Sequence, residues 1–98
     1  MKTTLSGKEY VVEYQDTREK SLAMLRKLEA LDRPVFAVDI ETMPREGYES
    51  YEKAALYPST GRPRLFQVFA GTKVQVLDLY DFDDTDYLQI NKFLNTKF

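Results

Sequence analysis

The sequence predicts an α/β domain, because strand-like and helix-like segments alternate along its 98 residues. Residues 34–40 read PVFAVDI, a nearly continuous apolar run that is typical of a strand covered on both faces. Residues 64–70 and 73–80 are both strand-like, and only Gly71 and Thr72 separate them, which predicts a hairpin. A helix is indicated by leucines at helical spacing, namely Leu22, Leu25, Leu28 and Leu31. The length fits one domain.

The first third of the chain predicts a strand followed by a helix. Residues 8–14, KEYVVEY, are rich in Tyr and Val, which favours a short edge strand. Asp16 and Glu19 have the spacing of a capping box, so a helix is expected over residues 17–31, with its leucines facing a sheet. Pro34 prevents the helix from continuing, because it lacks a backbone donor and disfavours helical geometry at the residue before it.

The remaining elements follow in the order strand, long loop, hairpin and helix. Residues 34–40 are expected to form the central strand, and residues 42–63 a long loop in which residues 48–56 form two helical turns. A final helix is predicted over residues 84–97, because acidic residues from 81 to 86 complement a helix dipole at its head. The predicted sheet is mixed and has three or four strands.

Composition excludes several classes of site. Sixteen acidic and fourteen basic residues leave a charge of -2, so contact with nucleic acid must be local or helped by cations. The chain contains neither Cys nor His, which excludes disulfides, thiolate zinc sites and catalysis by imidazole. Carboxylates, Lys, Tyr and hard oxygen-liganded metals remain. No segment resembles a signal peptide or a membrane span, so we expect a cytoplasmic protein without membrane contact.

The strongest candidate for chemistry is the pair Asp39 and Glu41, at the end of the predicted central strand. Residues two apart on a strand leave the same face, roughly 6.6 Å apart along it. Carboxylate oxygens are ligands that Mg²⁺ or Mn²⁺ prefers, and two such ions about 3.5 to 4 Å apart can support phosphodiester cleavage. Bound cations would also let a mildly acidic protein approach a phosphate backbone.

A plain reading of the same two residues is solvation of an exposed strand end, since a lone D-x-E is common. The apolar run before Asp39 favours the functional reading, because an ionised carboxylate among apolar residues is costly unless something compensates it.

The stretch VFAVDIET, followed after a variable segment by GRPRLFQVFAGTKVQVLDLY, resembles the opening of the DEDD-type 3′-5′ exonuclease domain. Such domains occur in ribonuclease D and in the proofreading part of family A DNA polymerases, and the similarity covers about residues 34–98. It implies a ribonuclease H-like fold in which Asp39 and Glu41 are catalytic ligands of two Mg²⁺ or Mn²⁺ ions. It also implies that Thr42 and Met43 touch the 3′ end of single-stranded DNA or RNA.

Arginines of the following segment are weaker candidates. Arg45, with Arg62 and Arg64, could form a rim that touches phosphate, whereas arginines on a solvated loop are the commoner explanation. Tyr48, Tyr51 and Tyr57 could stack on bases, but tyrosines at this spacing more often pack a short helix against its domain.

The resemblance is incomplete. Family members need a second motif with Asn and Asp and a third with Tyr or His and another Asp, and the sequence stops at INKFLNTKF, about where the second would begin. We therefore expect one incomplete domain, with an N-terminal part over residues 1–33 and an exonuclease-like part over residues 34–98. Two carboxylates would hold metals loosely, so little nuclease activity is expected from the chain alone. The acidic run at 81–86 is assigned to loop and helix cap.

Three hypotheses remain at this point. The chain is part of a nuclease whose site a complementing polypeptide or a second copy restores, or a small protein that has lost catalysis and keeps a ribonuclease H-like scaffold for binding. The third makes it an ordinary α/β interaction module.

Overall fold

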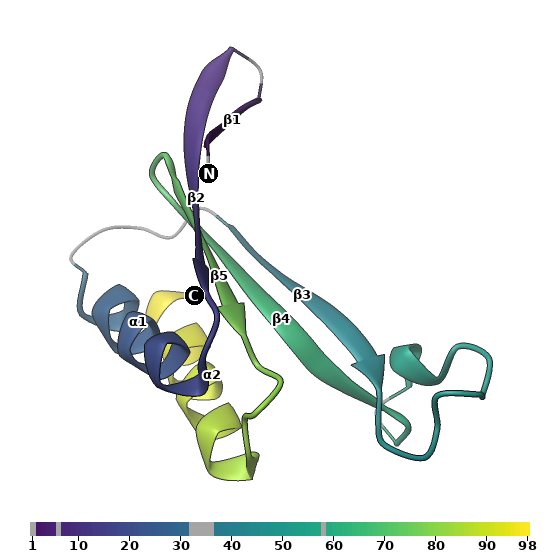
Figure 1. The fold of residues 1–98 in the computed structure, drawn as a ribbon. Helices are drawn as coiled ribbons and strands as arrows, with labels where there is room; N and C mark the ends of the chain where they lie inside the picture. The colour runs from purple at the N-terminus through teal and green to yellow at the C-terminus, as the bar shows by residue number, and fades with distance from the viewer. Residues whose placement is uncertain (1, 6, 32–36, 58) are drawn as a thin grey trace.

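The structure is a computed structural model that describes residues 2–5, 7–31, 37–57 and 59–98. It contains a five-stranded mixed sheet and two α-helices (Figure 1), which confirms the α/β class and adds one strand to the largest number predicted. The strands are β1 (Lys2–Leu5), β2 (Lys8–Gln15), β3 (Ala37–Pro44), β4 (Gly61–Ala70) and β5 (Lys73–Asp78). The helices are α1 (Arg18–Ala30) and α2 (Asp84–Lys97), with a short 3-10 helix, η1 (Ala54–Leu56).

The strand order is β1-β2-β5-β4-β3, with β2 and β5 parallel and the other neighbours antiparallel. Two predicted positions in the sheet are wrong. The N-terminal strand β2 was expected at an edge and lies inside, between β1 and β5, whereas β3 was expected at the centre and lies at an edge. The parallel pairing of β2 with β5 joins residues about sixty positions apart, which no local pattern indicates. Residues 34–36 of the predicted strand lie outside the described residues.

Both helices pack on one face of the sheet, as Figure 1 shows, and the core lies between these layers. Phe66 of β4 meets Phe93 of α2 edge to face, with ring centroids 5.9 Å apart. The other buried apolar residues of this core are Leu25, Leu28, Val68, Leu77, Leu79, Phe82 and Ile90. We call this the helix face of the sheet, and the opposite one the open face.

Helix α1 confirms the predicted helix to within a residue at each end. Leu25 and Leu28 are buried, and Leu31 lies just beyond the helix, exposed. The N-cap is Thr17 rather than a box of Asp16 and Glu19: the Thr17 hydroxyl accepts from the amide of Lys20 at 3.1 Å. Asp16 instead pairs with the ammonium of Lys20.

The hairpin and the last helix follow the predictions closely. Strands β4 and β5 are joined by Gly71 and Thr72, and Gly71 has a φ of 65°, the positive value that tight hairpin turns need. Helix α2 spans the predicted residues, and Asp83 and Asp86 form a reciprocal capping box at its start. The structural role assigned to the acidic run is confirmed.

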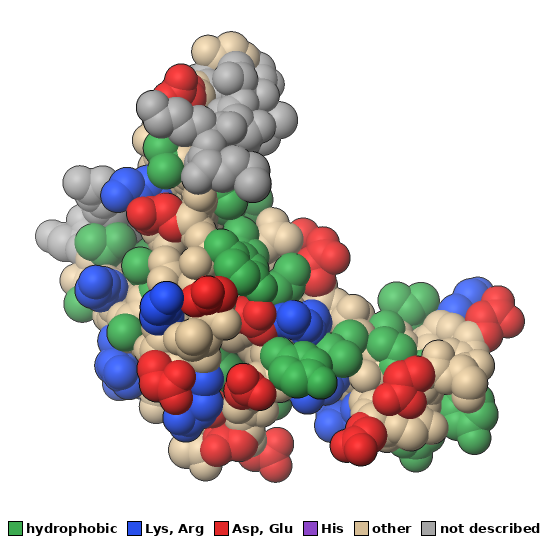
Figure 2. Space-filling model, in the orientation of Figure 1, with side chains coloured by type: hydrophobic (Ala, Val, Ile, Leu, Met, Phe, Trp, Pro, Cys, Tyr) green, Lys and Arg blue, Asp and Glu red, His purple; other side chains and the backbone are tan. Residues whose placement is uncertain are grey.

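The long loop is shorter than expected. Residues 42–44 continue β3, and residues 61–63 begin β4, which leaves residues 45–60 as an excursion from the edge of the sheet (Figure 1). Of the helical turns predicted over residues 48–56, only η1 is present. In Figure 2 the excursion is the lobe at the lower right, which carries hydrophobic, acidic and basic side chains together.

In the described part of the chain, neither helix combines the length and the apolar character needed to cross a bilayer.

Candidate metal site on strand β3

Strand β3 places its acidic and apolar side chains on opposite faces of the sheet. Ile40 pairs with Phe66 and therefore faces the helices, since Phe66 belongs to the core. Asp39 pairs with Gln67, and Glu41 with Leu65, so both carboxylates leave the open face. The first register irregularity comes after Glu41, between Glu41 and Thr42, so the two acids keep the regular alternation.

The surroundings of these acids differ from the buried setting expected. Asp39 and Glu41 are exposed, as are most residues of β3, so the argument that a buried carboxylate needs compensation does not hold here. The reason is the edge position of β3, which has one neighbouring strand among the described residues instead of two. Asp39 accepts a hydrogen bond from the amide of Ile40 at 3.0 Å. Among the described residues, neither acid forms an ion pair with Lys or Arg.

The donor set at this position suits a hard cation but is small. Carboxylate oxygens are the ligands that Mg²⁺ and Mn²⁺ favour, and both acids have room for them on an uncovered surface. Nowhere in residues 2–5, 7–31, 37–57 and 59–98 do three or more Asp, Glu, His or Cys gather in a group that could hold a metal. Asp39 and Glu41 therefore amount to a pair of ligands.

The residues predicted to contact nucleic acid are spread around the end of β3. Thr42 is exposed and Met43 half-buried, and both follow the register irregularity, whose extra residue is Arg64 of β4. Thr42 lines a hollow beside η1, together with Leu56 and Arg62. Arg45 begins the excursion, and its amide donates to the carbonyl of Thr60 at 2.7 Å, which closes the excursion at its base.

Arg45 is not brought to the open face with the two acids. It lines a groove between β3 and α2, on the side of the sheet that Ile40 faces. The structure thus unites Asp39 and Glu41 on one surface and puts Arg45 at the margin of another.

A polar network on the open face was not found by sequence reasoning. Asp78 of β5 accepts from the hydroxyl of Tyr14 at 2.6 Å, from the amide of Tyr80 at 2.9 Å and from the guanidinium of Arg64. Burial raises the pKa of Asp78, but these hydrogen bonds and the charge of Arg64 outweigh it and hold the pKa below its usual range. The same hydrogen bond, with burial, raises the pKa of Tyr14. The parallel pairing of β2 with β5 brings Tyr14 to Asp78, and the antiparallel pairing of β4 with β5 brings Arg64 there.

Two of the candidate phosphate-binding arginines are held in strand β4 rather than on a solvated loop. The guanidinium carbons of Arg62 and Arg64 lie 5.4 and 5.1 Å from the centroid of the Tyr80 ring. Arg62 also donates to the carbonyls of Leu79 and Tyr80, while Arg64 pairs with Asp78. These contacts hold β4 against the end of β5 and the segment after it, which gives both side chains a structural role, while the buried Nε of Arg62 has no hydrogen-bond partner among the described residues.

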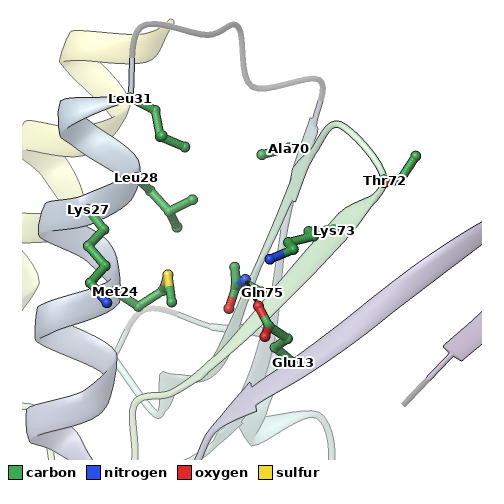
Figure 3. Close-up of a pocket in the computed structure, with 9 residues that line it drawn as sticks. All are labelled: Glu13, Met24, Lys27, Leu28, Leu31, Ala70, Thr72, Lys73 and Gln75. Atoms are coloured by element: carbon green, nitrogen blue, oxygen red, sulfur yellow. Dashed lines mark hydrogen bonds between the residues drawn. The ribbon is translucent and has the colours of Figure 1, made fainter.

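A separate cleft of about 540 Å³ lies between α1 and the sheet (Figure 3). Figure 3 shows Met24 and Leu28 reaching toward it from α1, opposite Lys73 and Gln75 of the sheet, while the side chain of Lys27 runs along the helix. The amide of Gln75 is already bound: its nitrogen donates to Glu13, and its oxygen accepts from Gln15 at 3.0 Å. None of the predicted site residues lines this cleft.

Comparison of the chain with protein-family models, with curated proteins and with solved structures gives no match.

Proposed function

We propose that this chain supplies the first motif of a DEDD-type 3′-5′ exonuclease with a ribonuclease H-like fold, acting on the ends of single-stranded DNA or RNA. The observation that carries the proposal is the placement of Asp39 and Glu41. Both acids leave the same uncovered face of β3, they are exposed, and no described Lys or Arg neutralises them. Adjacent like charges repel, so a pair left uncompensated in this way suits a divalent cation.

In this proposal Asp39 and Glu41 would hold Mg²⁺ or Mn²⁺. Such ions, when bound, supply a nucleophilic water near neutral pH and offset negative charge at the scissile phosphate. Thr42 and Met43, which follow the two acids directly along β3, would then meet the terminal nucleotide. An exposed Thr hydroxyl can donate to phosphate or sugar, and a half-buried Met can pack against a base or a sugar.

Activity also requires carboxylates from outside the described residues. Two ligands leave a cation mobile, and catalysis falls steeply when the reacting groups are misplaced by about 1 Å. Because the described residues offer no third acidic group for the site, we expect the chain alone to have little or no activity. A second polypeptide that carries the later motifs of the family would complete it.

The test is a complementation assay. The chain is mixed with the polypeptide that carries the second and third motifs of a DEDD-type exonuclease, and release of mononucleotides from a 3′-labelled single strand is measured with Mg²⁺. We expect release from the mixture, and almost none from either component or after addition of EDTA.

Matched variants test whether the restored activity depends on these two acids or only on the overall negative charge of the chain. Asp39→Asn and Glu41→Gln should each abolish the restored activity, because each removes a metal ligand and little volume. Glu52→Gln in the excursion removes the same charge from another exposed position and should leave the activity unchanged. A mixture that binds tightly but releases no mononucleotide would contradict the nuclease proposal and favour the alternative below.

The alternative is a scaffold that binds another macromolecule without catalysis. The observation that favours it is the group of large apolar side chains that the excursion leaves exposed. The excursion alone exposes Tyr48, Tyr51, Leu56 and Tyr57. Surface clusters of this kind commonly mark interaction sites. A scaffold predicts that substitution of Asp39 or Glu41 leaves partner binding intact.

A further inference from the structure

The outer edge of β3 is open for pairing. Strand β3 hydrogen-bonds to β4 along one side, and within the described residues no strand lies on its other side. An edge of this kind presents a row of backbone donors and acceptors that an extended peptide can pair with. Natural edge strands are normally protected by bulges, charges or Pro. The register irregularity, in which Arg64 is the extra residue of β4, and Pro44 of β3 both come after Glu41, so residues 37–41 keep a regular backbone.

An apolar groove adjoins this edge on the helix face. The groove holds about 240 Å³ and runs between β3 and α2. Its apolar lining consists of Ile40, Pro63, Leu79, Tyr87, Ile90 and Leu94. Ile40 remains 43% exposed, although it faces the same side as the core. Apolar side chains of a strand added beside β3 would enter this groove and cover Ile40.

On the open face, the same edge carries negative charge. Asp39 and Glu41 lie on either side of Ile40 in the sequence and leave the opposite face, exposed and without a described Lys or Arg partner. In an added strand, the residues that alternate with the apolar ones would lie opposite these carboxylates. Cross-strand pairs of opposite charge stabilise a sheet, and like charges directly opposite destabilise it.

We propose that residues 37–41 of β3 pair with an extended strand of another polypeptide, in which apolar and basic residues alternate. The apolar residues pack into the groove beside Ile40, and the basic ones face Asp39 and Glu41. A second copy of this chain is a poor occupant, because pairing of two β3 edges would bring the acids of both copies together. The proposal concerns peptide binding and does not rest on the nuclease proposal, but a divalent cation held by Asp39 and Glu41 would compete with the basic residues of the peptide.

The test uses a labelled synthetic peptide in which Val and Lys alternate, with fluorescence anisotropy as the measurement and amide NMR shifts to locate the site. We expect saturable binding and the largest shifts at residues 37–41. A peptide of the same composition with Val and Lys in separate blocks, a Val–Glu peptide and a peptide N-methylated at alternate residues should each bind at least roughly tenfold more weakly, a loss of about 1.4 kcal/mol.

Variants of the chain complete the experiment. Ile40→Lys should weaken binding of the alternating peptide by a similar factor, because it places a charge at the mouth of the groove. Leu88→Lys is the matched control, since Leu88 is 61% exposed on α2 and does not line the groove, and it should bind like the native chain. Circular dichroism checks that both variants fold.

Three results would overturn the proposal. The first is that the peptide with Val and Lys in separate blocks, or the N-methylated peptide, binds as tightly as the alternating peptide. Binding would then reflect only general charge attraction. The second is unchanged binding by Ile40→Lys. The third is a native dimer in sedimentation that Ile40→Lys dissolves, which would make a second copy the occupant of this edge.

Discussion

Arg18, the first residue of α1, binds Asp86 in the first turn of α2 through two hydrogen bonds. Its Nε donates to Oδ2 at 2.6 Å and its Nη2 donates to Oδ1 at 2.8 Å. Asp86 is only 4% exposed, and it also accepts from the amide of Asp83 at 3.1 Å. One carboxylate thus caps α2 and ties the two helices together where both begin.

Asp86→Ala should lower the free energy of unfolding by about 2 kcal/mol, because it removes a capping partner and leaves part-buried donors of Arg18 and Asp83 unpaired. Chemical denaturation measures the effect. Asp84→Ala is the matched control in the same turn: Asp84 is exposed, and its loss should cost well under half as much. Equal losses would mean that the pair with Arg18 contributes nothing specific.

The stability of the protein should fall on acidification in a way that depends on Asp86. Hydrogen bonds from Arg18 hold the pKa of Asp86 below its usual range, more than burial raises it. A depressed folded-state pKa means that the contribution is present above about pH 4, the unfolded value, and is lost as the pH falls below it. Asp86→Asn should show a smaller loss between about pH 4 and pH 2 than the native chain. If the stabilities of Asp86→Asn and the native chain fell in parallel with pH, the acid dependence would not come from Asp86.

At the alkaline end, Tyr14 should control part of the stability. Its hydrogen bond to Asp78 raises its pKa above the ordinary value near 10. The bond therefore stabilises the fold below about pH 10 and is lost as the pH rises through the folded-state pKa. Tyr14→Phe should be less stable than the native chain at pH 8, and the difference should shrink at alkaline pH. Tyr51→Phe, at an exposed position in the excursion, should show no such change.

Gly61 should tolerate no side chain. A Cβ built on Gly61 would lie 2.5 Å from the carbonyl oxygen of Ala55, a backbone atom that cannot rotate away. Gly61→Ala should therefore destabilise the chain by about 2 kcal/mol or more and displace η1. Gly71→Ala meets no neighbouring atom and should cost only about 1 kcal/mol, through its positive φ. Thermal unfolding of both variants shows which substitution destabilises the chain more. A milder effect at Gly61 would contradict the close approach of Gly61 to the backbone of Ala55.

Local patterns predicted the elements whose signals are local. Helix α2 has its acidic head and amphipathic body in one stretch, and the hairpin of β4 and β5 has its turn at Gly71. The predicted order of β2 and β3 in the sheet was wrong, because order depends on pairing between distant segments. An apolar run such as that before Asp39 has the same appearance in an edge strand and in a central one. Only the pairing partners distinguish them.

The candidate site could be predicted only in part. The two-residue spacing of Asp39 and Glu41 was sufficient to predict a shared face, because the side-chain period of a strand is two. Their exposure was one of the two interpretations that the sequence left open, and the edge position of β3 decides in its favour. Arg45 was expected on a rim with Arg62 and Arg64, but it lines the groove between β3 and α2, whereas Arg62 and Arg64 are held over the ring of Tyr80.

The claim that Asp39 and Glu41 form a cation site is tested most directly by titration with Mn²⁺, whose unpaired electrons broaden the NMR signals of nearby nuclei. We expect weak binding, with a dissociation constant on the order of 1 mM, and the strongest broadening at the amides of Asp39 and Glu41 and of Gln67 across the sheet. Asp39→Asn should abolish this broadening. Broadening that is centred on the acidic turn before α2, or that persists in Asp39→Asn, would contradict the claim.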